Sequence, residues 1–178
     1  MPERTLRLTG PRVALRTARR GDAEALHAIR SEPGVRRWWL APDPVEVIAA
    51  ELSGGSDGEV VLVVEVGDEV AGAIQFWEED DPQYRHATID LYLGERHRGQ
   101  GLGPEAVAVL AAYLVDVRGH HRLTIDPAVD NEAAIRAYAK VGFRPVGVLR
   151  RYERGEDGRW HDGLLMDLLA EDLVRQNG

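Results

Sequence analysis

The sequence predicts an α+β fold, with helices packed on a mixed, largely antiparallel sheet. Three apolar runs follow one another in mid-chain, at residues 60–66, 70–77 and 87–93, with only Gly67-Asp68-Glu69 between the first two. Apolar runs bounded by such turn residues are typical of strands in an antiparallel meander. Two helical patterns and further short strands come after the meander, and this mixture of element types indicates the α+β class.

The N-terminal part is expected to supply one strand pair and two helices. Residues 6–8 and 13–16 are expected to pair across a Gly10-Pro11 turn. Asp22 is expected to cap the first helix, because an Asp side chain can accept from the free N–H groups of a first turn. A second helix is expected over residues 44–52.

A longer helix is expected to begin at Gly103, after the meander. Pro104 suits a first helical turn, and Glu105 would lie beside the positive end of the helix dipole. Gly119 is expected to end this helix. The side chains expected to form its buried stripe are Val107, Leu110, Leu114 and Val117.

The C-terminal part is expected to alternate strand and helix once more and then close with a hairpin. A short strand at residues 123–125 precedes a helix capped by Asp130 or Asn131, and the hairpin joins residues 143–152 and 160–169. The predicted order is β-α-α-β-β-β-α-β-α-β-β. A length of 178 residues fits a single domain spanning 1–178.

Composition excludes several kinds of protein. Cysteine is absent, which rules out disulfides, thiolate metal ligands and an acyl-cysteine intermediate, and the scattered histidines predict no metal site. A formal net charge of −8 argues against nucleic acid as a partner. No apolar run is long enough to span a membrane, and no apolar segment follows Met1, so a cytoplasmic location is expected.

A glycine-rich loop precedes the long helix, with the sequence Arg98-Gly99-Gln100-Gly101-Leu102-Gly103. Glycines let backbone N–H groups converge on phosphate oxygens at a helix N-terminus, although an exposed turn has the same composition. The loop lacks the GxxxxGK[ST] pattern of a P-loop. It fits the dinucleotide-binding fingerprint formally at Gly101, Gly103 and Ala106, but it does not directly follow a strand and the preceding meander is antiparallel.

The loop resembles the R/Q-x-x-G-x-G/A pyrophosphate loop of the GNAT acetyltransferases. Asn131, Tyr138 and Val141-Gly142-Phe143 resemble the second characteristic segment of that family, and the element order agrees as well. The resemblance implies that acetyl-CoA is the co-substrate and that its pantetheine adds to the edge of the strand at residues 89–93. The cofactor-binding residues that it implies are Leu91, Tyr92, Leu93, Arg98, Gly99, Gln100, Gly101, Leu102, Gly103, Asn131 and Tyr138.

Acetyl transfer to an amine needs a base for the ammonium proton, a donor to the developing oxyanion, and an acid for the leaving thiolate. Without cysteine, direct attack in a ternary complex is expected. The resemblance places Tyr138 beside the sulfur as the acid, although a core role is also open because Tyr138 shares a helical stripe with Ile135 and Val141.

Asp90 lies inside an apolar strand, where an unpaired carboxylate is costly. Alternation places it on one face with Thr88 and Tyr92. A salt bridge to an arginine is the alternative reason for its presence. Asp126 ends a predicted strand before Pro127, where a turn-starting Asp is as plausible as a functional one.

The middle of the chain contains Trp38-Trp39, Trp77-Glu78-Glu79-Asp80-Asp81-Pro82, Ile89-Asp90, and Ile125-Asp126-Pro127 followed by Asn131. With these segments it resembles the aminoglycoside 6′-N-acetyltransferases, enzymes of antibiotic resistance. That resemblance implies a polycationic acceptor, with acids contacting its ammonium groups and Asp90 as the base. Trp38 and Trp39 would wall the cleft, although paired tryptophans are as often core residues. The acceptor-binding residues implied are Trp38, Trp39, Trp77, Glu78, Glu79, Asp81, Asp90 and Asp126.

Two other functions stay open at this point. The segment 160–166, Trp-His-Asp-Gly-Leu-Leu-Met, also resembles GNAT enzymes that acetylate protein N-termini. A catalytically silent acyl-CoA-binding module would keep the glycine loop but need neither Asp90 nor Tyr138. The sequence leaves open which amine is acetylated, whether acyl groups larger than acetyl are accepted, and whether the protein is a monomer or a homodimer.

Overall fold

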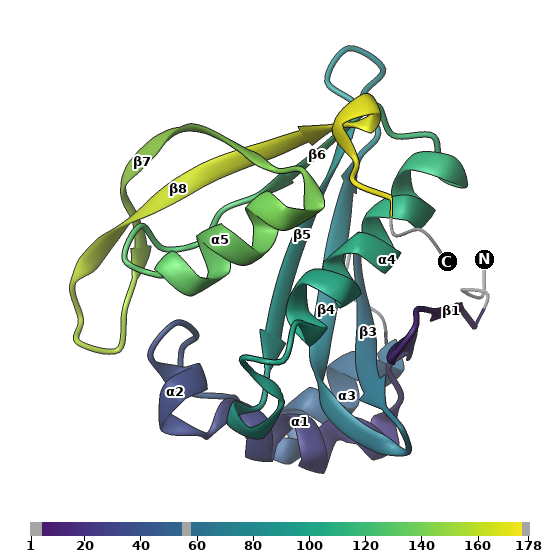
Figure 1. The fold of residues 1–178 in the computed structure, drawn as a ribbon. Coiled ribbons are helices and arrows are strands. Elements are labelled where there is room, and N and C mark those ends of the chain that lie inside the picture. The colour runs from purple at the N-terminus through teal and green to yellow at the C-terminus, as the bar shows by residue number, and fades with distance from the viewer. Residues whose placement is uncertain (1–4, 55–57, 176–178) are drawn as a thin grey trace.

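A computed structural model describes residues 5–54 and 58–175 and confirms the α+β class. One eight-stranded sheet has the order β1-β2-β3-β4-β5-β6-β8-β7 (Figure 1). Its strands are β1 Arg7–Thr9, β2 Val13–Thr17, β3 Glu59–Val66, β4 Glu69–Glu79, β5 His86–Leu93, β6 Arg122–Ile125, β7 Arg144–Arg154 and β8 Trp160–Leu169. The helices are α1 Ala23–Arg30, α2 Pro33–Arg36, α3 Val45–Gly54, α4 Leu102–Asp116 and α5 Glu132–Val141, with short 3₁₀ turns η1 Arg20–Asp22, η2 Glu95–His97 and η3 Ala170–Asp172.

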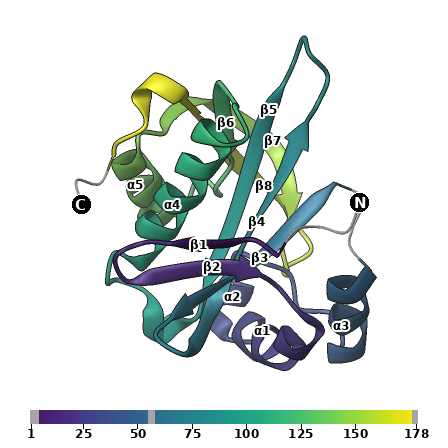
Figure 2. The ribbon, with the colours of Figure 1, turned by 90° about the vertical axis from the view of Figure 1, so that its right-hand side faces the viewer.

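The helices cover both faces of the sheet (Figure 2). Alternate residues of the central strands face opposite ways, so that Leu62 and Ile74 pack with α4 and α5, whereas Val63, Ala73 and Tyr92 pack with α1 and α2. Each face of the central strands is therefore covered by its own apolar cluster.

The gap between β5 and β6 is the feature that positions the site. These two strands run parallel and pair only at Ala87–Leu123 and Thr88–Thr124. Beyond Thr88, within the part of the chain that the structure describes, β5 has no strand partner on this side. Strands β7 and β8 turn away from β5, and α5 lies in the angle between them (Figure 1).

Two local predictions need correction. Asp22 precedes α1 but makes no cap hydrogen bond to that helix, because its carboxylate accepts from the Arg16 guanidinium at 2.7 and 2.8 Å. Val117 lies beyond the end of α4 and is 71% exposed, so it is not part of the buried stripe. Glu105 lies in the first turn of α4 as predicted, and its buried carboxylate also accepts hydrogen bonds from the backbone N–H groups of Arg12 and Val13, so it ties α4 to β2.

Candidate active site

The glycine loop lies between η2 and α4 and has the backbone that an anion-binding loop needs. Gly99 and Gly101 have φ values of +70° and +78°, which glycine adopts without strain. Gly101 occupies the N-cap position of α4, where no side chain satisfies the first N–H groups of the helix. These N–H groups have no partner within a helix and are suited to an anion.

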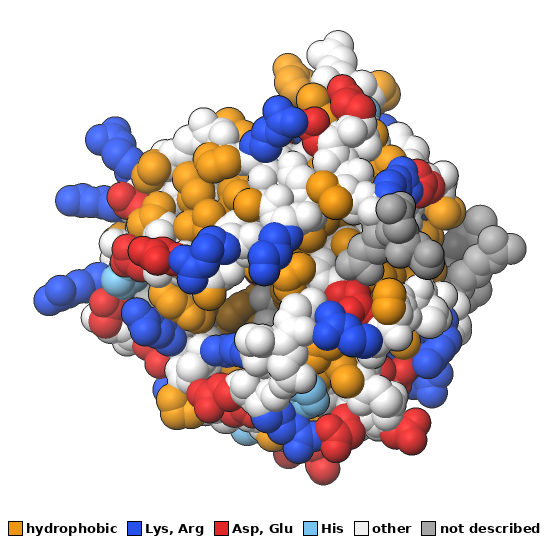
Figure 3. All heavy atoms as spheres, viewed as in Figure 1, with side chains coloured by type: hydrophobic (Ala, Val, Ile, Leu, Met, Phe, Trp, Pro, Cys, Tyr) orange, Lys and Arg blue, Asp and Glu red, His pale blue; other side chains and the backbone are white. Residues whose placement is uncertain are grey.

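A groove with a volume of about 600 Å³ runs from this loop along α5 to the open edge of β5. Basic side chains from three elements line it, namely Arg37, Arg98, Arg136 and Lys140. Figure 3 shows this face of the molecule hollowed between α5 and α2, with basic side chains around the rim. The groove therefore combines positive charge with free backbone donors, as a phosphate-bearing ligand requires.

Most of the predicted cofactor-binding residues line this groove. They are Leu91, Tyr92, Leu93, Arg98, Gly99, Gly101, Gly103, Asn131 and Tyr138. Gln100 and Leu102 are absent from the lining, because the Gln100 amide donates to the Arg96 carbonyl oxygen and the Leu102 side chain is buried in the core.

Two of the lining residues also hold the local structure. The Arg98 guanidinium donates to the carbonyl oxygens of Leu93 and Gly34, both at 3.0 Å, and so connects the loop to β5 and α2. Asn131 caps α5 by accepting from the Ala134 N–H at 3.2 Å, which settles the choice between Asp130 and Asn131.

A second cleft, of about 690 Å³, adjoins the groove, and Leu91, Asn131 and Tyr138 line both. Asp90 lies in this cleft on the sheet face of Tyr92, and its carboxylate accepts from the Leu91 N–H at 2.8 Å. Burial, together with the negative charges of Asp126 and Glu153, raises the pKa of Asp90 to about 7. The salt bridge considered as an alternative is not formed by Asp90 in the described chain.

Tyr138 projects from α5 between groove and cleft and is 6% exposed. Its ring packs against Phe143 with 6.3 Å between centroids, so it is a core residue as well as a lining residue. Burial, followed by the charges of Asp90 and Asp126, raises its pKa well above the ordinary value. The phenol therefore keeps its proton at neutral pH and can donate it.

Asp126 follows β6 and also lines the cleft. Its carboxylate accepts from the Tyr152 hydroxyl at 3.0 Å, while burial raises its pKa. Glu153, the next residue of β7, lines the cleft too, and the pKa of its carboxyl is raised by loss of solvent and by the Asp126 charge. Sequence reasoning missed both β7 residues, because they lie in a predicted hairpin strand with no motif around them.

All three predicted tryptophans line the cleft, namely Trp38, Trp39 and Trp77. Trp39 contacts Tyr92 edge-on with 4.8 Å between ring centroids, and the Arg30 guanidinium lies 5.3 Å from the Trp39 ring centroid. Trp38 is covered instead by Arg37, at 4.6 Å. The segment after α2 thus forms an aromatic wall fixed by cation–π contacts.

Three of the predicted acceptor acids lie outside the cleft, and for these the prediction is corrected. Glu78 is paired with Arg118 at 2.7 Å and with buried His120 at 2.7 Å, and the Arg118 pairing holds its pKa below the usual range against the effect of burial. Glu79 and Asp81 are exposed at the end of β4, where their carboxylates accept from backbone N–H groups of the same turn. None of the three lines the cleft of Asp90.

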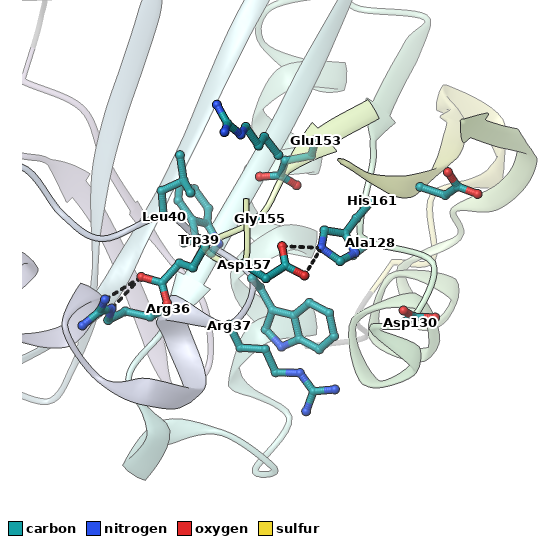
Figure 4. A pocket seen from close by; sticks show the side chains of 14 residues that line it. Arg36, Arg37, Trp39, Leu40, Ala128, Asp130, Glu153, Gly155, Asp157 and His161 are labelled. Atoms are coloured by element: carbon teal, nitrogen blue, oxygen red, sulfur yellow. Dashed lines mark hydrogen bonds and ion pairs between the residues drawn. The ribbon is translucent and has the colours of Figure 1, made fainter. Parts of the chain in front are cut away.

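A smaller pocket, of about 340 Å³, lies between the Trp38–Trp39 wall and the tip of the β7–β8 hairpin (Figure 4). Arg36 and Glu156 connect its two sides at 2.7 Å, and His161 pairs with Asp157 at 2.9 Å. Glu153 lines both this pocket and the cleft. The hairpin tip therefore contacts α2 beside the cleft.

No group of three or more His, Asp or Glu residues arranged to hold a metal ion occurs within residues 5–54 and 58–175. No helix in the described chain has both the length and the apolar character needed to span a membrane.

Comparison with known proteins places the chain among acetyltransferases. A spermidine N(1)-acetyltransferase of Escherichia coli K12 is 28% identical over 171 residues, which cover 93% of this chain and 90% of that protein. The structure of Mycobacterium smegmatis RimJ in complex with CoA-disulfide is 26% identical with a TM-score of 0.81, covering 97% of this chain and 90% of that one. A Vibrio cholerae spermidine N-acetyltransferase, solved with CoA and spermine, shares the fold with a TM-score of 0.80 at 20% identity, covering 92% and 98% of the two chains.

The model of one family, described as an acetyltransferase (GNAT) domain, matches residues 12–144, which is more than half of the chain. The match includes the glycine loop, Asp90, Asp126 and Tyr138. The chain therefore belongs to the GNAT acetyltransferase family.

Proposed function

We propose that this acetyltransferase transfers the acetyl group of acetyl-CoA to a primary amine of a small polycation. The observation that carries the proposal is a cleft lined by Asp90, Asp126 and Glu153, in which the charge of Asp126 raises the pKa of both other carboxyl groups. Carboxylates crowded in this way are stabilised by a ligand that brings several ammonium groups, and each charge-assisted contact contributes about 1.5–3 kcal/mol.

The groove is the site proposed for acetyl-CoA. The N–H groups at the start of α4 and the basic residues Arg136 and Lys140 suit its phosphates, and the unpaired edge of β5 suits the amides of its pantetheine arm. Leu91 and Tyr138 lie where groove and cleft meet, so the thioester would reach the amine there.

The chain supplies a group for each step of acetyl transfer. Asp90, with a pKa of about 7, can accept the proton that the ammonium must lose before its nitrogen attacks the thioester carbon. The Leu91 N–H donates to Asp90 in the resting site, and it can donate to the developing oxyanion when the Asp90 carboxyl group moves away from it. As the C–S bond breaks, Tyr138 can give its proton to sulfur and recover one from the new amide nitrogen.

Three kinds of acceptor are candidates, and a different observation favours each. The cleft residues Trp38, Trp39, Asp90 and Asp126 resemble those of aminoglycoside 6′-N-acetyltransferases, which favours the 6′-amine of an aminoglycoside. The 28% identical spermidine acetyltransferase favours a linear polyamine instead. A protein N-terminus is the other candidate, since enzymes acting on ribosomal proteins share the fold.

The test is a thiol-release assay with purified protein, acetyl-CoA and three acceptors: a kanamycin-type aminoglycoside, spermidine and an N-terminal peptide with one amine. We expect kcat/KM for at least one polycation to exceed that for the peptide tenfold or more, and to fall as salt rises from 0.05 to 0.5 M. A preference for the peptide would refute the polycation assignment. Binding of CoA without turnover of any acceptor would indicate a silent module.

A further inference from the structure

Strand β7 carries a β-bulge beside the cleft. Leu149 pairs with Gly163 and Glu153 pairs with His161, so β7 uses four residue steps where β8 uses two. Within this stretch Arg151 has a φ of +48°, and it is the only non-glycine residue with positive φ among residues 5–54 and 58–175. The Arg151 N–H donates to the Asp162 carboxylate at 2.7 Å, which holds this conformation.

The bulge changes which side chains face the cleft. Successive residues of a regular strand point to opposite faces, yet Tyr152 and Glu153 both line the cleft. The Tyr152 ring lies directly over Gly163, where an added Cβ would come within 3.0 Å of the ring. Any larger residue at position 163 would therefore displace Tyr152.

The same part of β8 is also hydrogen-bonded to the segment that follows Asp126. The Leu164 N–H donates to the Pro127 carbonyl oxygen at 2.8 Å, and the Val129 N–H donates to the Asp162 carbonyl oxygen at 3.1 Å. Asp162 thus fixes the bulge through its side chain and the segment after Asp126 through its backbone. The hydrogen bond from Tyr152 to Asp126 then joins the two walls directly.

We infer that the β7 bulge determines acceptor specificity, with Asp162 as a positioning residue that holds Tyr152 against Asp126 and Glu153 toward the second ammonium group of the acceptor. This inference rests on the proposed function. The Tyr152 hydroxyl donates to one carboxylate oxygen of Asp126, a residue that lines the cleft. Glu153 lies at the end of the cleft that opens toward the hairpin tip, where the far end of a long polycation would lie.

The measured quantity is the preference ratio, kcat/KM for 1,4-diaminobutane divided by kcat/KM for 1-aminobutane, because these acceptors differ only in the second ammonium group. Glu153→Gln should lower the ratio tenfold or more, since it removes one charge-assisted contact. Glu156→Gln is the matched control, since it makes the same change on the same hairpin at a carboxylate that pairs with Arg36. We expect the control to keep the ratio within twofold.

The role of the bulge itself is tested by its backbone. Arg151→Gly should keep the ratio, because glycine adopts a positive φ freely, whereas Arg151→Val should lower it, because a β-branched residue resists that conformation. Asp162→Ala should lower the ratio and raise KM for the diamine, and Asp162→Asn should restore both, since an amide oxygen can still accept from the Arg151 N–H. A merely structural role for Asp162 would reduce folded protein without changing the ratio.

Three outcomes are distinguishable. A ratio that falls in Glu153→Gln, Asp162→Ala and Arg151→Val supports the inference. A wild-type preference for the diamine that all three variants retain overturns the inference and leaves the proposed function standing. A wild-type ratio near one, with no turnover of aminoglycoside or spermidine, overturns both.

Discussion

Asp90→Asn should make the protein more stable at alkaline pH while abolishing most of its activity. The fold holds the Asp90 pKa at about 7, against an ordinary value of 3.8, through burial and the charges of Asp126 and Glu153. Because the folded state binds this proton more tightly than the unfolded state, stability falls as pH rises from about 4 to about 7 and is constant above. A shift of about 3 units corresponds to about 4 kcal/mol.

Asparagine removes the charge and keeps an oxygen that can accept from the Leu91 N–H. We therefore expect the variant to gain about 2–4 kcal/mol at pH 8, which for a chain of this length raises Tm by roughly 4–16 °C. The gain should shrink as pH falls below 7 and vanish near pH 4. Thermal and urea unfolding of both proteins from pH 4 to pH 9 measure this difference.

Asp116→Asn is the control of opposite sign. The hydrogen bond from Arg175 holds the pKa of Asp116 below its usual value, so the same substitution there should not raise Tm at pH 8. An Asp90→Asn variant no more stable than wild type at pH 8, or a gain of equal size at pH 4, would refute a buried carboxylate with a raised pKa.

Four further predictions concern the reaction. Gly101→Asp should weaken acetyl-CoA binding at least tenfold by calorimetry, and Gly101→Ala, which shares the strain of a positive φ without the charge, should weaken it less. Tyr138→Phe should lower kcat roughly 10²-fold with little change in CoA affinity, and an equal loss of stability would favour a purely core role. Asp126→Asn should mainly raise KM for the amine and leave KM for acetyl-CoA alone, whereas a matching loss in kcat would contradict a binding role. Because Asp90 must be ionised to act as a base, kcat/KM should rise with pH through about 7, and a flat profile between pH 6 and pH 8 would contradict that role.

The sequence predicted the strands and the two longer C-terminal helices well, because their periodicity is local. Asp90 was placed on the correct strand and face by alternation alone. Helix α2 was missed because four residues are too short to show helical periodicity. The fold was therefore predictable wherever one element could be recognised without its neighbours.

The same limit applies to the acids of the site, because the sequence shows a local pattern but not the partners that the fold brings to each acid. Glu78, like Asp90, is an acid adjoining apolar strand residues, but its partners Arg118 and His120 lie about 40 residues away in sequence and only the fold brings them together. Glu153 could not be found, because the bulge that orients it centres on Arg151, a residue type that gives no signal of positive φ. Long-range pairing and irregular strands therefore decide which acids line the cleft.

The position of β7 at the edge of the sheet has an evolutionary consequence. Nearly every residue of β7 is exposed, and no strand follows it in the sheet order. Substitutions on such a surface usually change stability by less than about 0.5 kcal/mol. The exposed positions of β7 outside the bulge can therefore be substituted at little cost in stability, and under the proposed function such substitutions would change the side of the cleft that meets the amine.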